Sequence, residues 1–214
     1  MCARGWLFET YFNKLNRRFI HKNKMVKNDS SDFYALEKNL NNIIKSIELC
    51  LNAKLQISSL ILLYSGIDIM AWLNRPVSEE FATRDDFIKW IDDYLLPNPN
   101  IKCEAIDLYA ARCAIIHSYS FSSRLSAEGK AKEIYYAWGE ANVKSLQNDI
   151  DSRSKKSVTA IHINDFLEAF KEGVEKFKLS IKSDKEKEKI VCDRANKYFF
   201  ASMSSDIYRK LGLE

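Results

Sequence analysis

Residues 55–73 have the sequence LQISSLILLYSGIDIMAWL, which is the longest apolar run in the chain. A helix that is apolar on nearly every side is expected at the centre of a bundle, because neighbouring helices must cover all of it. The run is almost long enough to span a membrane, but Gln56, three serines and Asp68 interrupt it. A charge inside a segment of marginal length favours a buried core helix. We therefore predict a central bundle helix here and no membrane span.

Segments on both sides of this run have the spacing of amphipathic helices. In residues 32–53, apolar residues recur every three or four positions, and Ser31 or Asp32 is placed to cap that helix. Thr83 is expected to cap a further helix, which ends where prolines break the chain. A fourth helix is predicted over residues 101–119.

The chain beyond Gly129 has a different pattern. Two stretches rich in β-favouring residues, 133–138 and 157–163, are predicted to pair as a small hairpin across the polar stretch 148–156. Helical segments are predicted after the second stretch: a helix from Asn164 or Asp165, a solvated link of alternating charge at 182–189, and a final segment at 190–213.

The composition supports a mainly α fold. The 214 residues include only 6 Gly and 3 Pro, which is few for an all-β protein with many turns, and 46% are hydrophobic. The predicted fold class is therefore mainly α, a helical bundle of four to six helices with a small β-hairpin. We predict three parts: an N-terminal arm at 1–31, a helical bundle core at 32–129, and a hairpin with C-terminal helices at 130–214 that pack on the core.

The N-terminal arm is rich in aromatic and basic residues. Trp6, Phe8, Tyr11 and Phe12 alternate with lysines, arginines and His21, and the spacing suits an amphipathic helix with a basic face. Such a helix could lie on RNA, on an anionic membrane or on the body of the protein. No continuous apolar stretch follows the positive charges, so the arm is not expected to be a secretory signal.

The charge and the cysteines limit the function classes. A net charge of +4 tolerates nucleic acid as a partner but does not demand it. Five dispersed cysteines without a Cys-x-x-Cys pair favour reduced thiols in the cytoplasm over a disulfide framework or a zinc site. The sequence lacks a Gly-rich phosphate loop, an acidic metal cluster and a Gly-x-Ser-x-Gly elbow, which disfavours kinases, P-loop enzymes and α/β-hydrolases. No cofactor or metal is expected.

Arg112, His117 and Tyr119 form the pattern R-x4-H-x-Y in the predicted fourth helix. Arginine binds phosphate oxygens and histidine moves protons near neutral pH, so the two can support phosphodiester chemistry without a metal. Residues five apart on a helix differ by about 140° around its axis, whereas Arg112 and Tyr119 would share a face. Arg112 and His117 could therefore meet only near a helix end, or with a second subunit supplying the mirror pair. The alternative is structural: Arg112 would cover the helix surface and His117 would cap its C-terminus.

On the fourth long helix of a bundle, this pattern resembles the R-x4–6-H signature of the HEPN superfamily. More narrowly, it resembles the R-x4-H-x-Y form of the toxins in HEPN–MNT toxin–antitoxin pairs, over about residues 32–121. The resemblance implies a helical bundle that dimerises so that two Arg/His pairs face one cleft, and metal-independent cleavage of RNA. It implies that His117 takes the proton of a ribose 2′-OH or protonates the leaving 5′-oxygen, and that Arg112 steadies the charge on the phosphate as a 2′,3′-cyclic phosphate forms.

The resemblance also implies partners. RNA is the expected substrate, and a nucleotidyltransferase antitoxin or another subunit of a prokaryotic defence system is the expected protein partner. Tyr119 would be the residue that the nucleotidyltransferase adenylylates. Active relatives commonly place a polar residue, often Asn, directly after the arginine, where this chain has Cys113. The alternative is therefore a non-catalytic helical module of the same fold that binds nucleotide or a protein partner.

Asp68 lies in the apolar run, where an unpaired carboxylate is costly to bury. It is predicted to brace Arg112 or His117, or else to pair with another cation or a helix N-terminus. Cys113 is expected to be a small core residue rather than a nucleophile. Asp107 ranks below Asp68 because its angular offset places it off the face of Arg112. A structural role is expected for His162 in its predicted strand.

Overall fold

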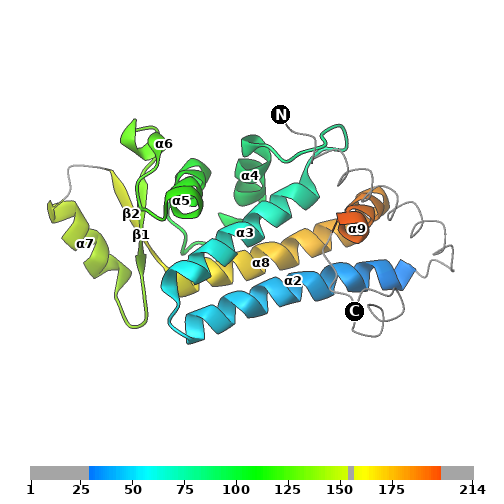
Figure 1. The fold of residues 1–214 in the computed structure, drawn as a ribbon, viewed down its shortest axis with the longest axis horizontal. Coiled ribbons are helices and arrows are strands. Elements are labelled where there is room, and N and C mark those ends of the chain that lie inside the picture. The colour runs from blue at the N-terminus through cyan, green and yellow to red at the C-terminus, as the bar shows by residue number, and fades with distance from the viewer. Residues whose placement is uncertain (1–28, 154–156, 199–214) are drawn as a thin grey trace, which may run out of the picture.

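Helix α3 (Gln56–Asn74) contains the apolar run and lies at the centre of a mainly α-helical bundle, as predicted (Figure 1). The computed structural model describes residues 29–153 and 157–198. Within these ranges, α3 is the one helix long and apolar enough to cross a membrane by length and composition, and half of its most apolar window is buried inside the protein. Such burial is typical of a core helix, and the fully buried residues include Leu60, Leu63 and Ile67.

Helices α2 (Asp29–Asn52) and α8 (Ile163–Lys182) run beside α3 (Figure 1). The close approach of the three helices depends on Gly66. A Cβ atom at that position would lie 2.8 Å from Cζ of Phe170 and 3.3 Å from Cγ2 of Ile43. Because the first distance is shorter than a normal contact, a larger residue at Gly66 would force the Phe170 ring to move.

The starts of two helices differ from the predicted ones. Helix α2 is described from Asp29, so Ser31 and Asp32 lie inside it and neither is its cap. Helix α5 (Ala105–Ser118) begins four residues after the predicted start. Asp107 fixes this start, because its Oδ2 accepts the backbone N–H of Glu104 at 3.0 Å and so pairs a group that the helix itself leaves unpaired.

Thr83 caps α4 (Arg84–Trp90), as predicted. Its Oγ1 accepts the N–H of Asp86 at 3.3 Å, and Asp86 Oδ2 accepts the N–H of Thr83 at 2.8 Å, so the two residues satisfy each other's backbone. The chain continues as a π-helical turn, η1 (Ile91–Leu95), which packs against α8 at Gly173. A Cβ atom on that glycine would lie 3.1 Å from a carbonyl oxygen of η1.

Strands β1 (Glu133–Ala137) and β2 (Val158–His162) do pair, but they are parallel, so the predicted hairpin is wrong. Helix α7 (Val143–Arg153) connects them and includes part of the stretch expected to be the hairpin's polar link. Parallel neighbours need such a crossover, because the chain must return to the same end of the sheet. Gln147 ties α7 to β2 by accepting the N–H of Ala160 at 2.7 Å and donating to the carbonyl of Val158 at 3.3 Å.

Helix α8 starts directly after β2, one residue before the predicted start at Asn164. His162 caps it, since Nδ1 accepts the N–H of Asn164 at 3.1 Å and Nε2 lies 3.0 Å from the carbonyl oxygen of Gly139. The expected structural role of His162 is therefore the role observed. Helix α9 (Lys185–Tyr198) begins within the alternating-charge segment, which was expected to be a helical link.

The bundle core and the C-terminal part share one hydrophobic cluster. Phe166, Phe170 and Phe177 of α8 are buried in the same cluster as the core residues of α2, α3 and α4. Most of the predicted N-terminal arm (residues 1–28) and the end of the predicted final helix (residues 199–213) lie outside the described residues.

Candidate functional site

The end of α5 brings Arg112 and His117 together within one chain. Nη1 of Arg112 lies 3.2 Å from Nε2 of His117. The two residues point about 140° apart around the helix axis. The helix ends at Ser118, however, so His117 is in its last turn, where the long arginine side chain can reach it. A helix end therefore suffices for the contact, without a second subunit.

Asp68, on α3, holds the other side of the guanidinium. Its Oδ2 accepts hydrogen bonds from Nε of Arg112 at 3.1 Å and from Nη2 at 2.9 Å. Of the partners expected for this carboxylate, Arg112 is the one observed. Burial alone would lower the pKa of Arg112, but the hydrogen bonds and the charge of Asp68 outweigh burial and raise that pKa. Arg112 is therefore a fixed positive charge.

The guanidinium of Arg112 keeps donors for a ligand. It has five N–H groups, and the three hydrogen bonds to Asp68 and His117 use three of them. The thiol of Cys113 is a further hydrogen-bond partner of this side chain, which leaves one N–H of the five. The side chain is 22% exposed and that of Asp68 is 34% exposed, so an anion can reach the pair from solvent. That remaining N–H, together with the one that now faces His117, can bind two oxygens of one phosphate group.

The contact with Arg112 also determines where His117 carries its proton. For Nη1 to donate to Nε2, that ring nitrogen must be unprotonated, which places the proton of the neutral ring on Nδ1. His117 is exposed. The Nε2 lone pair is occupied by this contact; when a ligand draws Arg112 away, it can accept a proton from a hydroxyl group whose neighbouring phosphate binds that charge.

Tyr119 ends α5 instead of lying on it. Its backbone is left-handed, with φ 52° and ψ 36°. Its N–H donates to the carbonyl of Ile115 and that of Ser120 to the carbonyl of Ala114, both at 3.2 Å. The prediction that Tyr119 shares a helical face with Arg112 is therefore wrong, because the backbone leaves the helix before it. The side chain is 68% exposed.

Tyr119→Gly is expected to raise the free energy of unfolding by about 0.5–1 kcal/mol, because glycine adopts the left-handed conformation without strain. Chemical denaturation measures this gain. Lys54 has φ 58° after α2 and provides the matched control. Lys54→Gly should give a gain of similar size. Loss of stability in Tyr119→Gly alone would show that the tyrosine ring supports the fold.

Cys113 interacts with two neighbouring side chains of α5, Arg112 and Tyr109. Cys113 is half-buried, not fully buried as expected of a core residue. Burial and the neighbouring thiol of Cys113 raise the pKa of Tyr109, one turn earlier on α5. Arg84 Cζ lies 5.4 Å from the centre of the Tyr109 ring, so a second guanidinium approaches this helix from α4.

No sequence pattern connects Phe121 with Tyr135, but the two rings are stacked in the structure. Their ring centroids are 5.8 Å apart and their planes differ by 9°. Tyr135 is the middle residue of β1, whose neighbouring positions are buried, so strand alternation alone could have placed it on the outer face. Its pairing with a residue of the loop after α5 depends on tertiary structure.

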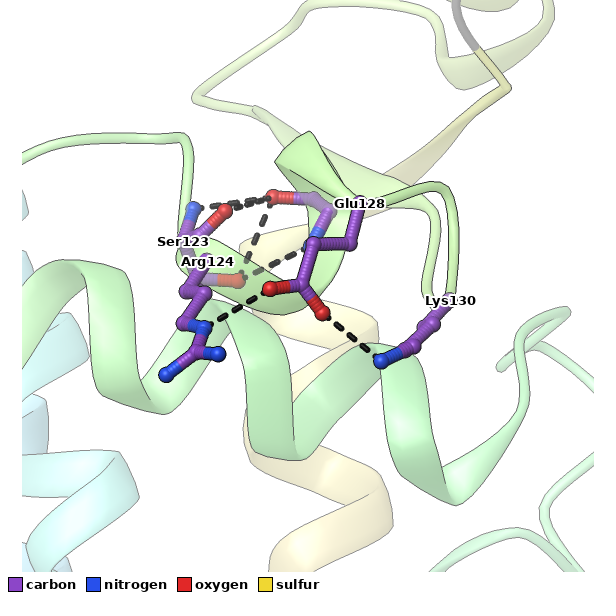
Figure 2. A network of polar contacts seen from close by, with 5 residues as sticks. Ser123, Arg124, Glu128 and Lys130 are labelled. Carbon is purple, nitrogen blue, oxygen red and sulfur yellow. Dashed lines mark hydrogen bonds and ion pairs between the residues drawn. The ribbon is translucent and has the colours of Figure 1, made fainter.

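The loop that carries Phe121 is held at both ends. The left-handed residue after α5 fixes one end. At the other end, Ser123 caps the short helix α6 (Arg124–Ala127). Figure 2 shows the network that closes this turn: Glu128 accepts from Nε of Arg124 at 2.7 Å and from Nζ of Lys130 at 2.8 Å. Both hydrogen bonds lower the pKa of Glu128, and the one from Lys130 has the larger effect. The network therefore stays charged at neutral pH.

The remaining acidic candidate, Asp107, has a structural role. It is buried, and its Oδ1 accepts the N–H of Lys132 at 2.7 Å, which ties the start of α5 to the segment before β1. Within residues 29–153 and 157–198, no group of three or more His, Cys, Asp or Glu side chains is placed to share a metal ion.

The chain was compared with protein-family models, with curated proteins and with solved structures, and none of the three comparisons found a match. These comparisons therefore assign neither a family nor a function. The function is inferred from the chain's own residues.

Proposed function

We propose that this chain is a metal-independent endoribonuclease of the HEPN type that acts in the cytoplasm, in a prokaryotic defence or toxin–antitoxin system. The observation that carries the proposal is the hydrogen-bonded chain from Asp68 through Arg112 to His117. It joins a fixed charge that can bind phosphate to an exposed imidazole that can move a proton. The resemblance of the R-x4-H-x-Y pattern to that family supports the same reaction.

In the proposed reaction, the ribose 2′-oxygen attacks the adjacent phosphorus and the 5′-oxygen of the next nucleotide leaves. His117 takes the proton of the 2′-hydroxyl while water protonates the leaving oxygen, or its protonated form gives a proton to the leaving oxygen while water takes the 2′-hydroxyl proton. The remaining N–H of Arg112 and the one that faces His117 bind the non-bridging oxygens, whose negative charge grows in the transition state. The P–O2′ bond forms as the P–O5′ bond breaks, so the products carry a 2′,3′-cyclic phosphate and a 5′-hydroxyl.

Substrate must replace the hydrogen bond between Arg112 and His117. That bond occupies the lone pair of Nε2, which His117 would need to accept the 2′-hydroxyl proton there. Asp68 binds Nε and Nη2, so it can hold the guanidinium while Nη1 changes partner from imidazole to phosphate. Asp68 is therefore a positioning residue in this proposal.

The proposal includes a homodimer with two such sites facing one cleft, and a regulatory partner that acts on Tyr119. Tyr119 follows His117 by two residues, and the residue is 68% exposed. Adenylylation by a nucleotidyltransferase would add a phosphate and a nucleoside beside the site. The added negative charge would compete with RNA for Arg112.

Incubation of the purified protein with RNA in excess EDTA tests the proposed function. We expect cleavage that persists in EDTA and products with 2′,3′-cyclic phosphate ends, identified by mass spectrometry. RNA with 2′-O-methyl groups should resist cleavage, because it lacks the attacking hydroxyl. Products with 3′-hydroxyl ends would contradict the proposed reaction. Binding of RNA without cleavage would favour the non-catalytic helical module, for which Cys113 after Arg112 leaves room.

Asp68→Asn is expected to lower kcat for RNA cleavage by about 10- to 100-fold, with a smaller change in KM. The amide can still accept a hydrogen bond, but it loses the charge that orients the guanidinium. Steady-state kinetics on the folded fraction measure both constants. Asp149→Asn is the matched control, because Asp149 pairs with Arg153 at 2.8 Å on the exposed helix α7. If Asp68→Asn lowered only the amount of folded protein and left kcat unchanged, its role would be structural.

A further inference from the structure

The stacked pair of Phe121 and Tyr135 lies on the surface. Phe121 is 49% exposed, and the ring of Tyr135 lies nearly parallel to its own ring. Because the centroids are 5.8 Å apart, the two rings are offset and Tyr135 covers only part of Phe121. Tyr135 is half-buried in the middle of β1, with Ile134 and Tyr136 buried on the opposite side of the strand. The fold thus holds two nearly parallel rings together and leaves about half of Phe121 in contact with water.

A second stacked pair shows what a structural role looks like in this protein. The rings of Tyr136 and Phe166 have centroids 6.2 Å apart and planes 19° apart, and both residues are buried in the core. That pair gains stability by excluding water from both rings. The pair of Phe121 and Tyr135 leaves about half of the phenylalanine in water, so burial does not account for it.

The exposed pair is close to the proposed catalytic residues. Phe121 follows His117 by four residues, so their Cα atoms are at most about 14 Å apart. The loop between them is fixed, since Tyr119 donates its N–H to α5 and Ser120 Oγ donates to the carbonyl of Ser122 at 3.0 Å. Helix α5 and strand β1 are also in direct contact. A ligand bound at Arg112 can therefore reach the ring of Phe121 within the length of a short oligonucleotide.

We propose that the pair of Phe121 and Tyr135 is a stacking site for an unpaired base of the RNA whose phosphate binds Arg112. An exposed ring face binds any nucleobase by stacking, without selecting among the four bases. In a duplex, bases already stack on their neighbours, so only an unpaired base can use this site. The substrate class that follows is single-stranded RNA. This inference rests on the proposed ribonuclease function.

Binding of a short single-stranded RNA with 2′-fluoro sugars, followed by fluorescence anisotropy, tests the inference without depending on cleavage. We expect Phe121→Leu to weaken binding by about tenfold, within the range measured for loss of one base–aromatic stack. Phe121→Trp should bind at least as tightly as the wild type, because it keeps a flat ring. A duplex of the same sequence should bind more weakly to the wild type and should not respond to Phe121→Leu.

Phe81→Leu is the matched control, because Phe81 is 74% exposed in the loop before α4 and does not belong to the proposed site. It should leave the affinity unchanged. Circular dichroism shows whether each variant is folded, and Phe121→Trp repeats the test with an aromatic side chain in place. If Phe121→Leu binds single strands as tightly as the wild type while cleavage persists, the stacking site is refuted and the ribonuclease function stands. If the wild type neither binds nor cleaves RNA, both are refuted.

Discussion

Arg112→Ala and His117→Ala are each expected to slow RNA cleavage by about 100- to 10,000-fold. The first removes the donors that hold the phosphate oxygens, and the second removes the group that moves the proton. Single-turnover rates, with protein in excess over RNA, measure the chemical step itself. Both variants should remain folded, because His117 is exposed and Asp68 keeps contact with water after Arg112 is removed.

The double variant Arg112→Ala/His117→Ala should be about as slow as the slower single variant. The two side chains are hydrogen-bonded and act on one transition state, so removing the second should cost little once the first is gone. If the rate reduction in the double variant were instead the product of the two single-variant reductions, the two residues would act independently, which would contradict a shared site.

Matched controls separate this site from general effects of charge. Arg153→Ala removes an arginine that is 76% exposed on α7 and pairs with Asp149, so the rate should not change. His162→Asn removes a histidine but keeps a side-chain oxygen that can cap α8. It should also cleave RNA at the wild-type rate. Equal loss of activity in these controls and in the site variants would refute the roles proposed for Arg112 and His117.

The contact between Arg112 and Asp68 shows what the sequence could predict of the site. An aspartate inside an apolar helix has to find a partner, and that requirement predicts Arg112 or His117, or else another cation or a helix N-terminus. Helical spacing, by contrast, predicts that Arg112 and His117 point in different directions from the helix axis. Their contact depends on where α5 ends. The helix ends at the left-handed backbone of Tyr119, a conformation that usually occurs at glycine, so the sequence does not indicate the end of the helix.

The fold could be predicted where neighbouring residues determine an element. The prediction failed where contacts between distant segments determine the topology. The apolar run of α3 and the capping residue Thr83 each specify their element through neighbouring side chains. The two strands were recognised from their composition, but their relative direction depends on α7, whose residues look polar whether they form a link or a helix. Periodicity could therefore find the strands without finding their topology.

The protein is expected to lose stability steeply in alkaline solution, because two buried tyrosines and a half-buried cysteine interact at its core. The hydroxyls of Tyr64 and Tyr136 are hydrogen-bonded to each other, and both residues are buried. Burial is the main cause that raises the pKa of both tyrosines. Tyr136 raises the pKa of Tyr64 further, whereas the hydrogen bond with Tyr64 partly lowers that of Tyr136, and the nearby thiol of Cys103 raises both. Burial also raises the pKa of Cys103, to about 12. All three groups therefore keep their protons in the folded protein well above the pH at which they lose them in the unfolded chain.

The direction of the change in stability with pH follows from which state, folded or unfolded, binds more protons. Above about pH 9 for the thiol and about pH 10 for the tyrosines, the unfolded chain has released protons that the folded protein still holds, so rising pH favours unfolding. Each group contributes about 1.4 kcal/mol per pH unit, and three together about 4 kcal/mol per unit above pH 10. A domain with about 5–15 kcal/mol of stability should therefore unfold between about pH 11 and about pH 13. The stabilisation is fully present below about pH 8 and is lost as pH rises toward the folded values.

Urea denaturation from pH 7 to pH 11 measures this dependence, and the variant Tyr64→Phe/Tyr136→Phe/Cys103→Ala tests its cause. Removing both hydroxyls together leaves neither unpaired, so the variant should fold at neutral pH with a moderate loss from the missing thiol. Its stability should then fall much less between pH 9 and pH 11 than that of the wild type. Tyr34→Phe, at a residue that is 66% exposed, should keep the wild-type slope. An unchanged slope in the triple variant would show that other groups govern alkaline unfolding and that this cluster does not.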